Sequence, residues 1–281
     1  MQRFFRGILF GIAGLILLAA VLGAVLSAIS ATVSVPPSSD DSFSEPIAPR
    51  LDLTDFRPGF LISDEVFYNY QAMDLPKIEA FIREKNAGCQ DGAAPCLANY
   101  RESTKDMPAT QRCSGYAGNP EESAAMIIFK TSQACHLNPQ VLLVLLQKEQ
   151  GLLTASGFDL TPARYEIATG FGCPDEQNCD ERFFGFSTQV YYAAAQFQRY
   201  RQQPHLFKIR AGQMTRIAFS PDPNCGDAEV FVENQATAGL YNYTPYQPDA
   251  GVLVGNPGHC SSFGNANFYG LFRAWFGDSH R

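Results

Sequence analysis

A single carboxylate at the end of a very apolar helix is the strongest candidate for chemistry in this chain. The segment begins at Asn138, a good N-cap, followed by Pro139, and it ends at Gly151, which can adopt the left-handed C-terminal conformation. Residues 141–146 between these ends are all apolar, which predicts a helix buried on every side. Glu149 follows about one turn later, so its side chain is expected to lie over the apolar face.

Two effects act on the Glu149 carboxylate in the same direction. Partial burial disfavours its charged form, and the C-terminal end of a helix carries partial negative charge that disfavours a nearby anion. Both favour a retained proton, which a general acid needs. The alternative interpretation is that Lys148, Glu149 and Gln150 form a solvated helix end, because most glutamates are surface residues.

The composition is that of a globular protein with an acidic balance. The chain has 281 residues, of which 46% are hydrophobic and 17% are charged. Its formal net charge is −7. Arg3 and Arg6 are the only charged residues before Asp40, so the remainder carries 19 basic and 28 acidic residues, a balance of −9. This balance argues against nucleic acid as a partner, because nucleic acid requires a basic surface. It leaves glycans open.

An apolar segment near the N-terminus predicts a single-pass membrane anchor. Residues 7–30 contain no charged side chain and are long enough to span a bilayer. Arg3 and Arg6 precede this segment and no basic residue follows before Arg50, so residues 1–6 are expected to be cytoplasmic. The alternative is a long signal segment that is cleaved near its small residues, which would release a secreted protein.

The chain after the anchor divides into a linker and one folded domain. Residues 31–55 contain a run of proline, serine and aspartate without an apolar period, which predicts a disordered linker. Residues 56–281 are expected to form the extracellular domain. No internal repeat is visible in the sequence.

Eight cysteines in an extracellular setting suggest disulfides, although eight cysteines allow many pairings. Two pairs are close enough in sequence to close short loops, and the remaining four cysteines would then tie longer loops. The proposed pairs are Cys89–Cys96, Cys113–Cys135, Cys173–Cys179 and Cys225–Cys260.

Capping residues and apolar spacing predict a mainly helical fold. Expected helices cover 74–84 with Asp74 as N-cap, 119–135 with Asn119 as N-cap, 138–151, 186–201 with Ser187 or Thr188 as cap, 235–241 and 267–276. The period changes between 207 and 234, where residues 216–219 and 229–232 predict a short hairpin around a turn at 220–227. The expected fold class is therefore mainly α with a small β-hairpin insertion.

The order of the central elements resembles a known family. A helix that starts with Asn138-Pro139 and ends at Glu149 is followed by a glycine-rich segment at 168–172 and by a helix over 190–200. This order resembles the lysozyme-like superfamily, in particular lytic transglycosylases and bacterial glucosaminidases that cleave peptidoglycan. The resemblance covers residues 115–277 and implies a lysozyme-like α+β fold, a peptidoglycan substrate and Glu149 as the catalytic acid.

A narrower resemblance and two departures qualify this assignment. The cysteine-bearing segments and the pattern over 243–277 resemble actinobacterial secreted proteins, some of which are labelled haemagglutinin-like. Gln150 stands where the family usually has serine after the catalytic glutamate. Cys173-Pro174-Asp175 replaces the Met-Gln that closes the glycine-rich motif of transglycosylases.

Sugar binding requires aromatic faces and polar groups around the acid. Tyr243 and Tyr246 flank Pro245 in an expected loop, which makes them better candidates than aromatics at helical spacing. Glycosidases often place a second carboxylate opposite the acid; the candidates are Glu166, Asp175 and Asp180, although the acidic loop around Asp175 and Asp180 also reads as a solvated turn. The proposed substrate-binding residues are Gln150, Gly170, Phe171, Gln189, Tyr192, Tyr243 and Tyr246.

No cofactor or metal is expected from the sequence. The four histidines lack close ligand spacing for zinc, and the acidic cluster over 222–229 departs from the EF-hand pattern. The sequence thus predicts a membrane-anchored, extracellular glycosidase or lytic transglycosylase acting on the cell wall. The alternative is a non-catalytic surface protein that binds glycans or mediates adhesion on the same scaffold.

Overall fold

The structure is a computed structural model that describes residues 51–174 and 177–281. The expected membrane segment at 7–30 and the linker up to residue 50 lie outside the described residues, as does the candidate carboxylate Asp175. None of the helices in the described ranges is long and apolar enough to cross a membrane.

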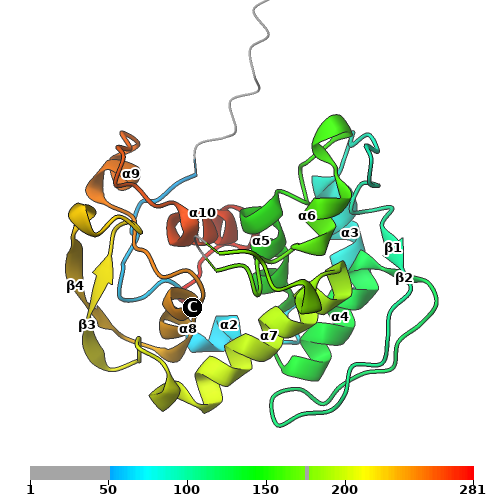
Figure 1. Cartoon of the computed structure of the whole chain (residues 1–281), viewed down its shortest axis with the longest axis horizontal. Helices are drawn as coiled ribbons and strands as arrows, with labels where there is room; N and C mark the ends of the chain where they lie inside the picture. The colour runs from blue at the N-terminus through cyan, green and yellow to red at the C-terminus, as the bar shows by residue number, and fades with distance from the viewer. Residues whose placement is uncertain (1–50, 175–176) are drawn as a thin grey trace, which may run out of the picture. The chain divides into compact units, whose positions relative to one another are not determined.

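The described residues form a helical domain with two small antiparallel sheets (Figure 1). The α-helices are α2 (Asp64–Phe67), α3 (Leu75–Lys85), α4 (Ala124–Cys135), α5 (Pro139–Gln150), α6 (Pro162–Glu166), α7 (Phe186–Gln202), α8 (Gln235–Tyr243), α9 (Ala250–Val254) and α10 (Gly264–Phe276). One sheet pairs β1 (Arg101–Glu102) with β2 (Glu122–Ser123), and the other pairs β3 (Gln213–Ala218) with β4 (Asp227–Val232).

Helix α5 forms the centre of the hydrophobic core. Each residue from Val141 to Leu146 is fully buried, as the apolar run predicts. The Asn138 side chain accepts a hydrogen bond from the Gln140 amide, and Gly151 ends the helix at φ +64°. Helices α4 and α10 pack against α5, and α7 packs against α4 and α8. The local signals therefore place Glu149 where α5 leaves the core.

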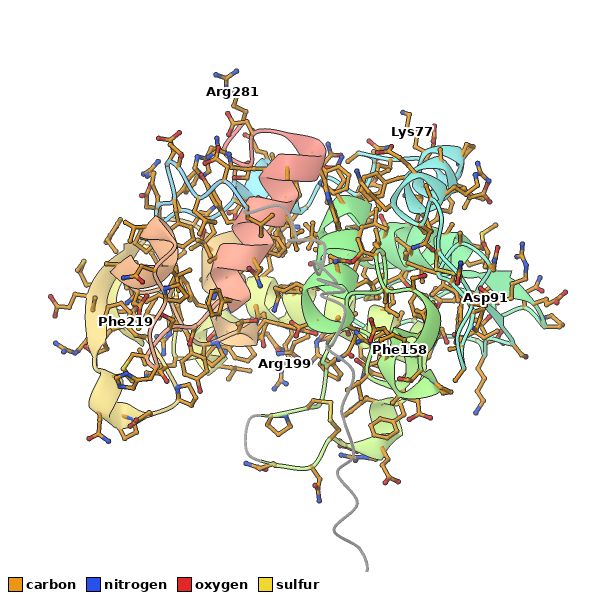
Figure 2. The ribbon with its side chains drawn as sticks, turned by 90° about the horizontal axis from the view of Figure 1, so that it is seen from above. Lys77, Asp91, Phe158, Arg199, Phe219 and Arg281 are labelled. Carbon is orange, nitrogen blue, oxygen red and sulfur yellow. A yellow bond between two sulfur atoms is a disulfide. The ribbon has the colours of Figure 1, made fainter. Side chains whose placement is uncertain are left out.

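The predicted hairpin lies at the opposite end of the domain from the first cysteine loop. Strands β3 and β4 pair in antiparallel register, with Arg216 opposite Glu229 and Ile217 opposite Ala228. Figure 2 shows Phe219 of the hairpin and Asp91 of the cysteine loop on opposite sides, with α5 and α10 between them. Both ends thus flank the central helix pair.

The predicted start of the helix at 119–135 is wrong. Ser123, not Asn119, is the N-cap, and its hydroxyl accepts a hydrogen bond from the Met126 amide. Glu122 instead belongs to a strand, and its buried carboxylate is ion-paired with Lys130. These long-range contacts keep 119–122 out of the helix, although its end at Cys135 is as predicted.

The predicted cap of α7 is also wrong. Gly185 is the N-cap residue and makes no side-chain cap. The Ser187 amide donates to the Glu102 carboxylate at 2.7 Å, so a residue from strand β1 takes over the capping role.

The four predicted disulfides are all present. Each of Cys89–Cys96, Cys113–Cys135, Cys173–Cys179 and Cys225–Cys260 is bonded. The third pair closes a loop directly after the glycine-rich segment and therefore lies beside the end of α5.

Candidate functional site

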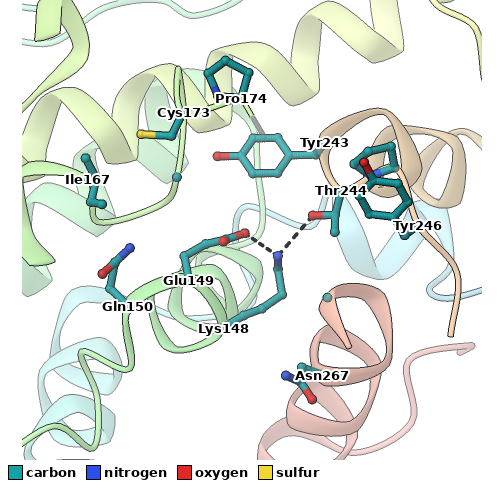
Figure 3. Close-up of a pocket in the computed structure, with 13 residues that line it drawn as sticks. Lys148, Glu149, Gln150, Ile167, Cys173, Pro174, Tyr243, Thr244, Tyr246 and Asn267 are labelled. Atoms are coloured by element: carbon teal, nitrogen blue, oxygen red, sulfur yellow. Dashed lines mark hydrogen bonds and ion pairs between the residues drawn. The ribbon is translucent and has the colours of Figure 1, made fainter. Parts of the chain in front are cut away.

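A pocket of about 580 Å³ opens at the C-terminal end of α5 (Figure 3). The Glu149 side chain lines it and is 24% exposed, so the carboxylate is neither sealed in the core nor free in solvent. The other lining residues are Lys148, Gln150, Ile167, Gly170, Cys173, Pro174, Tyr243, Thr244, Pro245, Tyr246, Gly264 and Asn267.

Lys148 changes the electrostatics expected for Glu149. Its side chain is only 5% exposed, and its ammonium is ion-paired with the Glu149 carboxylate and donates to Thr244 Oγ1 at 3.1 Å. Arg164 also donates to the Gln150 carbonyl at 2.5 Å, which offsets the negative end of the helix. The structure thus places two cations at the negative end of α5, which the local sequence pattern does not indicate. The interpretation of Lys148 as a solvated residue is wrong.

The glycine-rich segment after α6 packs directly against the carboxylate. Gly170 adopts φ +71°, and a Cβ placed there would lie 3.3 Å from Glu149 Oε2. The absence of a side chain therefore allows the turn to approach Glu149 closely, in a conformation that favours glycine.

If Glu149 has the catalytic role predicted from the sequence, the Gly170→Ala variant is expected to lose activity beyond its loss of stability. The left-handed backbone costs about 1 kcal/mol for alanine, and the added methyl group displaces the carboxylate, which is expected to lower the cleavage rate roughly 10-fold or more. Gly212→Ala is the matched control, because Gly212 has φ +73° and open space around its Cβ position. Thermal unfolding and wall-cleavage rates check both variants, and equal rates for the two would refute the steric role of Gly170.

Gln189 does not face the pocket but holds the glycine-rich turn from behind. It is fully buried, and its Oε1 accepts hydrogen bonds from the Thr169 and Phe171 amides, each at 3.1 Å. Its Nε2 donates to the Phe171 and Phe183 carbonyls, each at 2.8 Å. The side chain is thus occupied within the protein, and the structure does not bring this predicted substrate partner to the pocket.

The aromatic candidates divide into two groups. Phe171 and Tyr192 stack on each other with ring centroids 5.9 Å apart and contact Phe183; they are not among the pocket-lining residues, contrary to the prediction. Tyr243 and Tyr246 do line the pocket, together with the predicted Gln150 and Gly170. The pocket rim therefore presents two tyrosines.

Tyr243 is fixed at the boundary between pocket and core. Its ring stacks on Phe197 at 4.9 Å, and its hydroxyl donates to the Thr169 carbonyl at 2.8 Å. Burial, followed by the nearby charge of Glu149, raises the pKa of Tyr243 well above its usual range. The hydroxyl therefore stays protonated and keeps the glycine-rich turn in place.

Glu149 is the only carboxylate among the described residues that line the pocket. Glu166, a predicted second carboxylate, lies at the end of α6 with its side chain exposed, and the structure does not place it among the pocket-lining residues. Asp180, the further candidate in the cysteine loop, is bound to Arg182. Asp175 lies outside the described residues.

Three polar pocket residues were missed by the sequence interpretation. Lys148 directly precedes the predicted acid, and its position alone indicates no more than a solvated helix end, although its side chain is almost completely buried. Thr244 lies between the two predicted tyrosines, so its place in the sequence was a usable signal. Asn267 near the start of α10 carries no local signal, because only the packing of α10 on α5 brings it to the pocket.

One group of side chains in the described ranges has the spacing of metal ligands. Cys225, His259 and Cys260 lie together, but the two sulfur atoms are bonded to each other in a disulfide. Thiolates, rather than disulfide sulfurs, bind metal ions, so this group offers one imidazole and no metal site in its oxidised form.

Comparisons with known proteins do not assign a function to the site. No protein-family model matches the chain, and searches of curated proteins and of solved structures found no match. The site combines one carboxylate, one buried ammonium, two tyrosines and neutral amide and hydroxyl groups in a pocket open to solvent.

Proposed function

We propose that this domain cleaves the glycan strands of peptidoglycan, with Glu149 as the single general acid and base. The observation that carries the proposal is the partly buried Glu149 carboxylate in a pocket of about 580 Å³. Ligand pockets commonly measure about 300–1,000 Å³, so the space suits sugar residues. The order of α5, glycine-rich turn and α7 supports the resemblance to lysozyme-like enzymes.

The proposed mechanism uses the carboxyl group twice. Protonated Glu149 gives its proton to the glycosidic oxygen as the bond to the leaving sugar breaks. The resulting carboxylate then takes a proton from the sugar's own 6-hydroxyl group, which closes an anhydro ring, or from a water molecule, which gives hydrolysis. No second carboxylate among the described pocket residues faces Glu149, and this favours the ring-closing route.

The location of the domain is part of the same proposal. Four disulfides fit an oxidising compartment outside the cytoplasm. Together with the apolar segment at 7–30, they support a domain tethered outside the membrane, beside the cell wall.

A second function is favoured by the ion pair between Lys148 and Glu149. A carboxylate held by a buried ammonium is available to bind a ligand but is less ready to carry a proton. The domain would then bind wall glycans without cleaving them.

Mass analysis of purified peptidoglycan, both intact and freed of its stem peptides, after treatment with the full-length protein tests the proposal. We expect soluble fragments with anhydro ends; fragments that have gained one water indicate hydrolysis instead. An undigested wall that sediments together with the protein would replace the enzymatic proposal with the binding function.

A further inference from the structure

The buried ammonium of Lys148 raises a problem for the proposed chemistry. Proton donation requires protonated Glu149, whereas its carboxylate is ion-paired with Lys148. Lys148 is nevertheless built into the site, because its side chain is 5% exposed and Thr244 Oγ1 accepts a second hydrogen bond at 3.1 Å. A buried ammonium needs a charged partner, so Lys148 can release Glu149 only if another anion takes its place.

The described residues that line the pocket include no other anion that could do so. Glu149 is the only acidic residue among the described pocket-lining residues, and Lys148 is the only cation among them. Both side chains point toward the same space below Tyr243 and Thr244 in Figure 3. An ammonium has three N–H donors, and two of them are used by Glu149 and Thr244. Among the described pocket residues no other anion is available, so a ligand is the candidate source of the replacing anion.

We propose that Lys148 is a specificity-determining residue that binds a carboxylate on the glycan, next to the bond that Glu149 cleaves. This proposal rests on the proposed function and names its substrate class. When the ligand carboxylate pairs with Lys148, Glu149 loses its counter-charge and takes up a proton from solvent, which restores the charge balance of the pocket. A neutral glycan leaves the ion pair between Lys148 and Glu149 intact.

The contact between Lys148 and Glu149 limits which carboxylate of peptidoglycan can bind to Lys148. Because Lys148 Nζ touches the Glu149 carboxylate, a group bound to it lies within two hydrogen-bond lengths of the acid. The lactyl group of N-acetylmuramic acid is attached to the sugar ring itself and satisfies this limit, whereas carboxylates of the stem peptide lie further along a flexible chain. The lactyl carboxyl is free only when the stem peptide is absent. The reaction that supplies this substrate is therefore hydrolysis of the amide bond between lactyl group and peptide.

Affinities of monosaccharides test the proposal without any cleavage. The ligands are N-acetylmuramic acid, its primary amide and a muramyl dipeptide, in which the lactyl group is amidated and the free carboxylate belongs to the peptide. Ligand-observed NMR titration of the full-length wild-type protein is expected to show the acid bound roughly 10-fold more tightly than the amide. Lys148→Met is expected to bind both ligands equally, with its folding checked by thermal unfolding.

Glu149→Gln supplies an independent test that does not depend on the folding of the lysine variant. Because Glu149 and the ligand carboxylate compete for Lys148, its replacement is expected to increase the affinity for the acid about threefold or more and to leave the amide unchanged. The proposal would be overturned if the wild-type protein bound the acid and the amide with equal affinity. It would also be overturned if Lys148→Met kept the wild-type ratio of these two affinities. A Lys148-dependent preference for the dipeptide would instead assign the peptide carboxylate and contradict the lactyl assignment.

The affinity test with monosaccharides and the wall-cleavage test can each fail without the other. A monosaccharide has no bond between sugars to cleave, so its affinity does not depend on turnover. If the affinity pattern holds while the wall stays intact, the domain is a carboxylate-specific glycan binder. If the wall is cleaved but the pattern is absent, Glu149 acts without this role of Lys148.

Discussion

Glu149→Gln is expected to lower the rate of wall cleavage by about 100-fold to 10,000-fold, the range that a positioned general acid contributes. The amide has nearly the shape of the carboxyl group but neither donates nor takes up the proton that the reaction needs. Because Glu149 is the only acidic group among the described pocket residues, none of these can take over its role. The rate is measured by release of soluble fragments, with mass analysis of their ends.

Glu166→Gln is the matched control for this experiment. It makes the same chemical change on an exposed residue of α6 that does not line the pocket, so the cleavage rate is expected to stay within about twofold of wild type. Equal clearing by wild type and Glu149→Gln would exclude Glu149 as the acid. A large loss in Glu166→Gln would instead restore it as a second catalytic carboxylate.

Local signals were sufficient to predict helix α5 and the position of its acid. The Asn138 cap, the apolar run and Gly151 act within one segment, and neither partner nor packing was needed to interpret them. The predicted start of α4 is wrong for the opposite reason. Asn119 is a plausible cap on its own, but the strand pairing of Glu122 depends on Glu102 of β1, which folding brings near.

The same distinction explains the errors at the site. Lys148 and Glu149 are neighbours in sequence, and adjacent residues on a helix do not normally face each other. Their pairing occurs at the helix end, where Thr244 of a distant segment accepts a hydrogen bond from the same ammonium. Gln189 was interpreted as a polar group for sugars because sequence patterns do not reveal which backbone groups of a distant turn need partners.

Gln189→Leu is expected to lower the free energy of unfolding by about 3 kcal/mol or more. The change leaves the buried Thr169 amide and both backbone groups of Phe171 without their side-chain partner, and each unsatisfied group costs about 1–3 kcal/mol. Chemical denaturation of the full-length protein measures this difference. We also expect a reduced cleavage rate in the folded fraction, because Gly170 lies between the two residues that Gln189 holds and lines the pocket beside Glu149.

Gln198→Leu distinguishes the role of Gln189 in holding the glycine-rich turn from the general cost of removing a buried amide side chain in α7. Gln198 is also buried on that helix, but its side chain makes a single hydrogen bond, from Nε2 to the His136 carbonyl at 3.1 Å. Its replacement is expected to cost about 1 kcal/mol and to leave the cleavage rate unchanged, because His136 is not among the pocket-lining residues. Equal losses of stability in the two variants would contradict the multiple contacts of Gln189. An unchanged cleavage rate in Gln189→Leu would show that the action of Glu149 does not depend on a fixed glycine-rich turn. The comparison of the two variants therefore tests how the acid is positioned, whereas Glu149→Gln tests which residue is the acid.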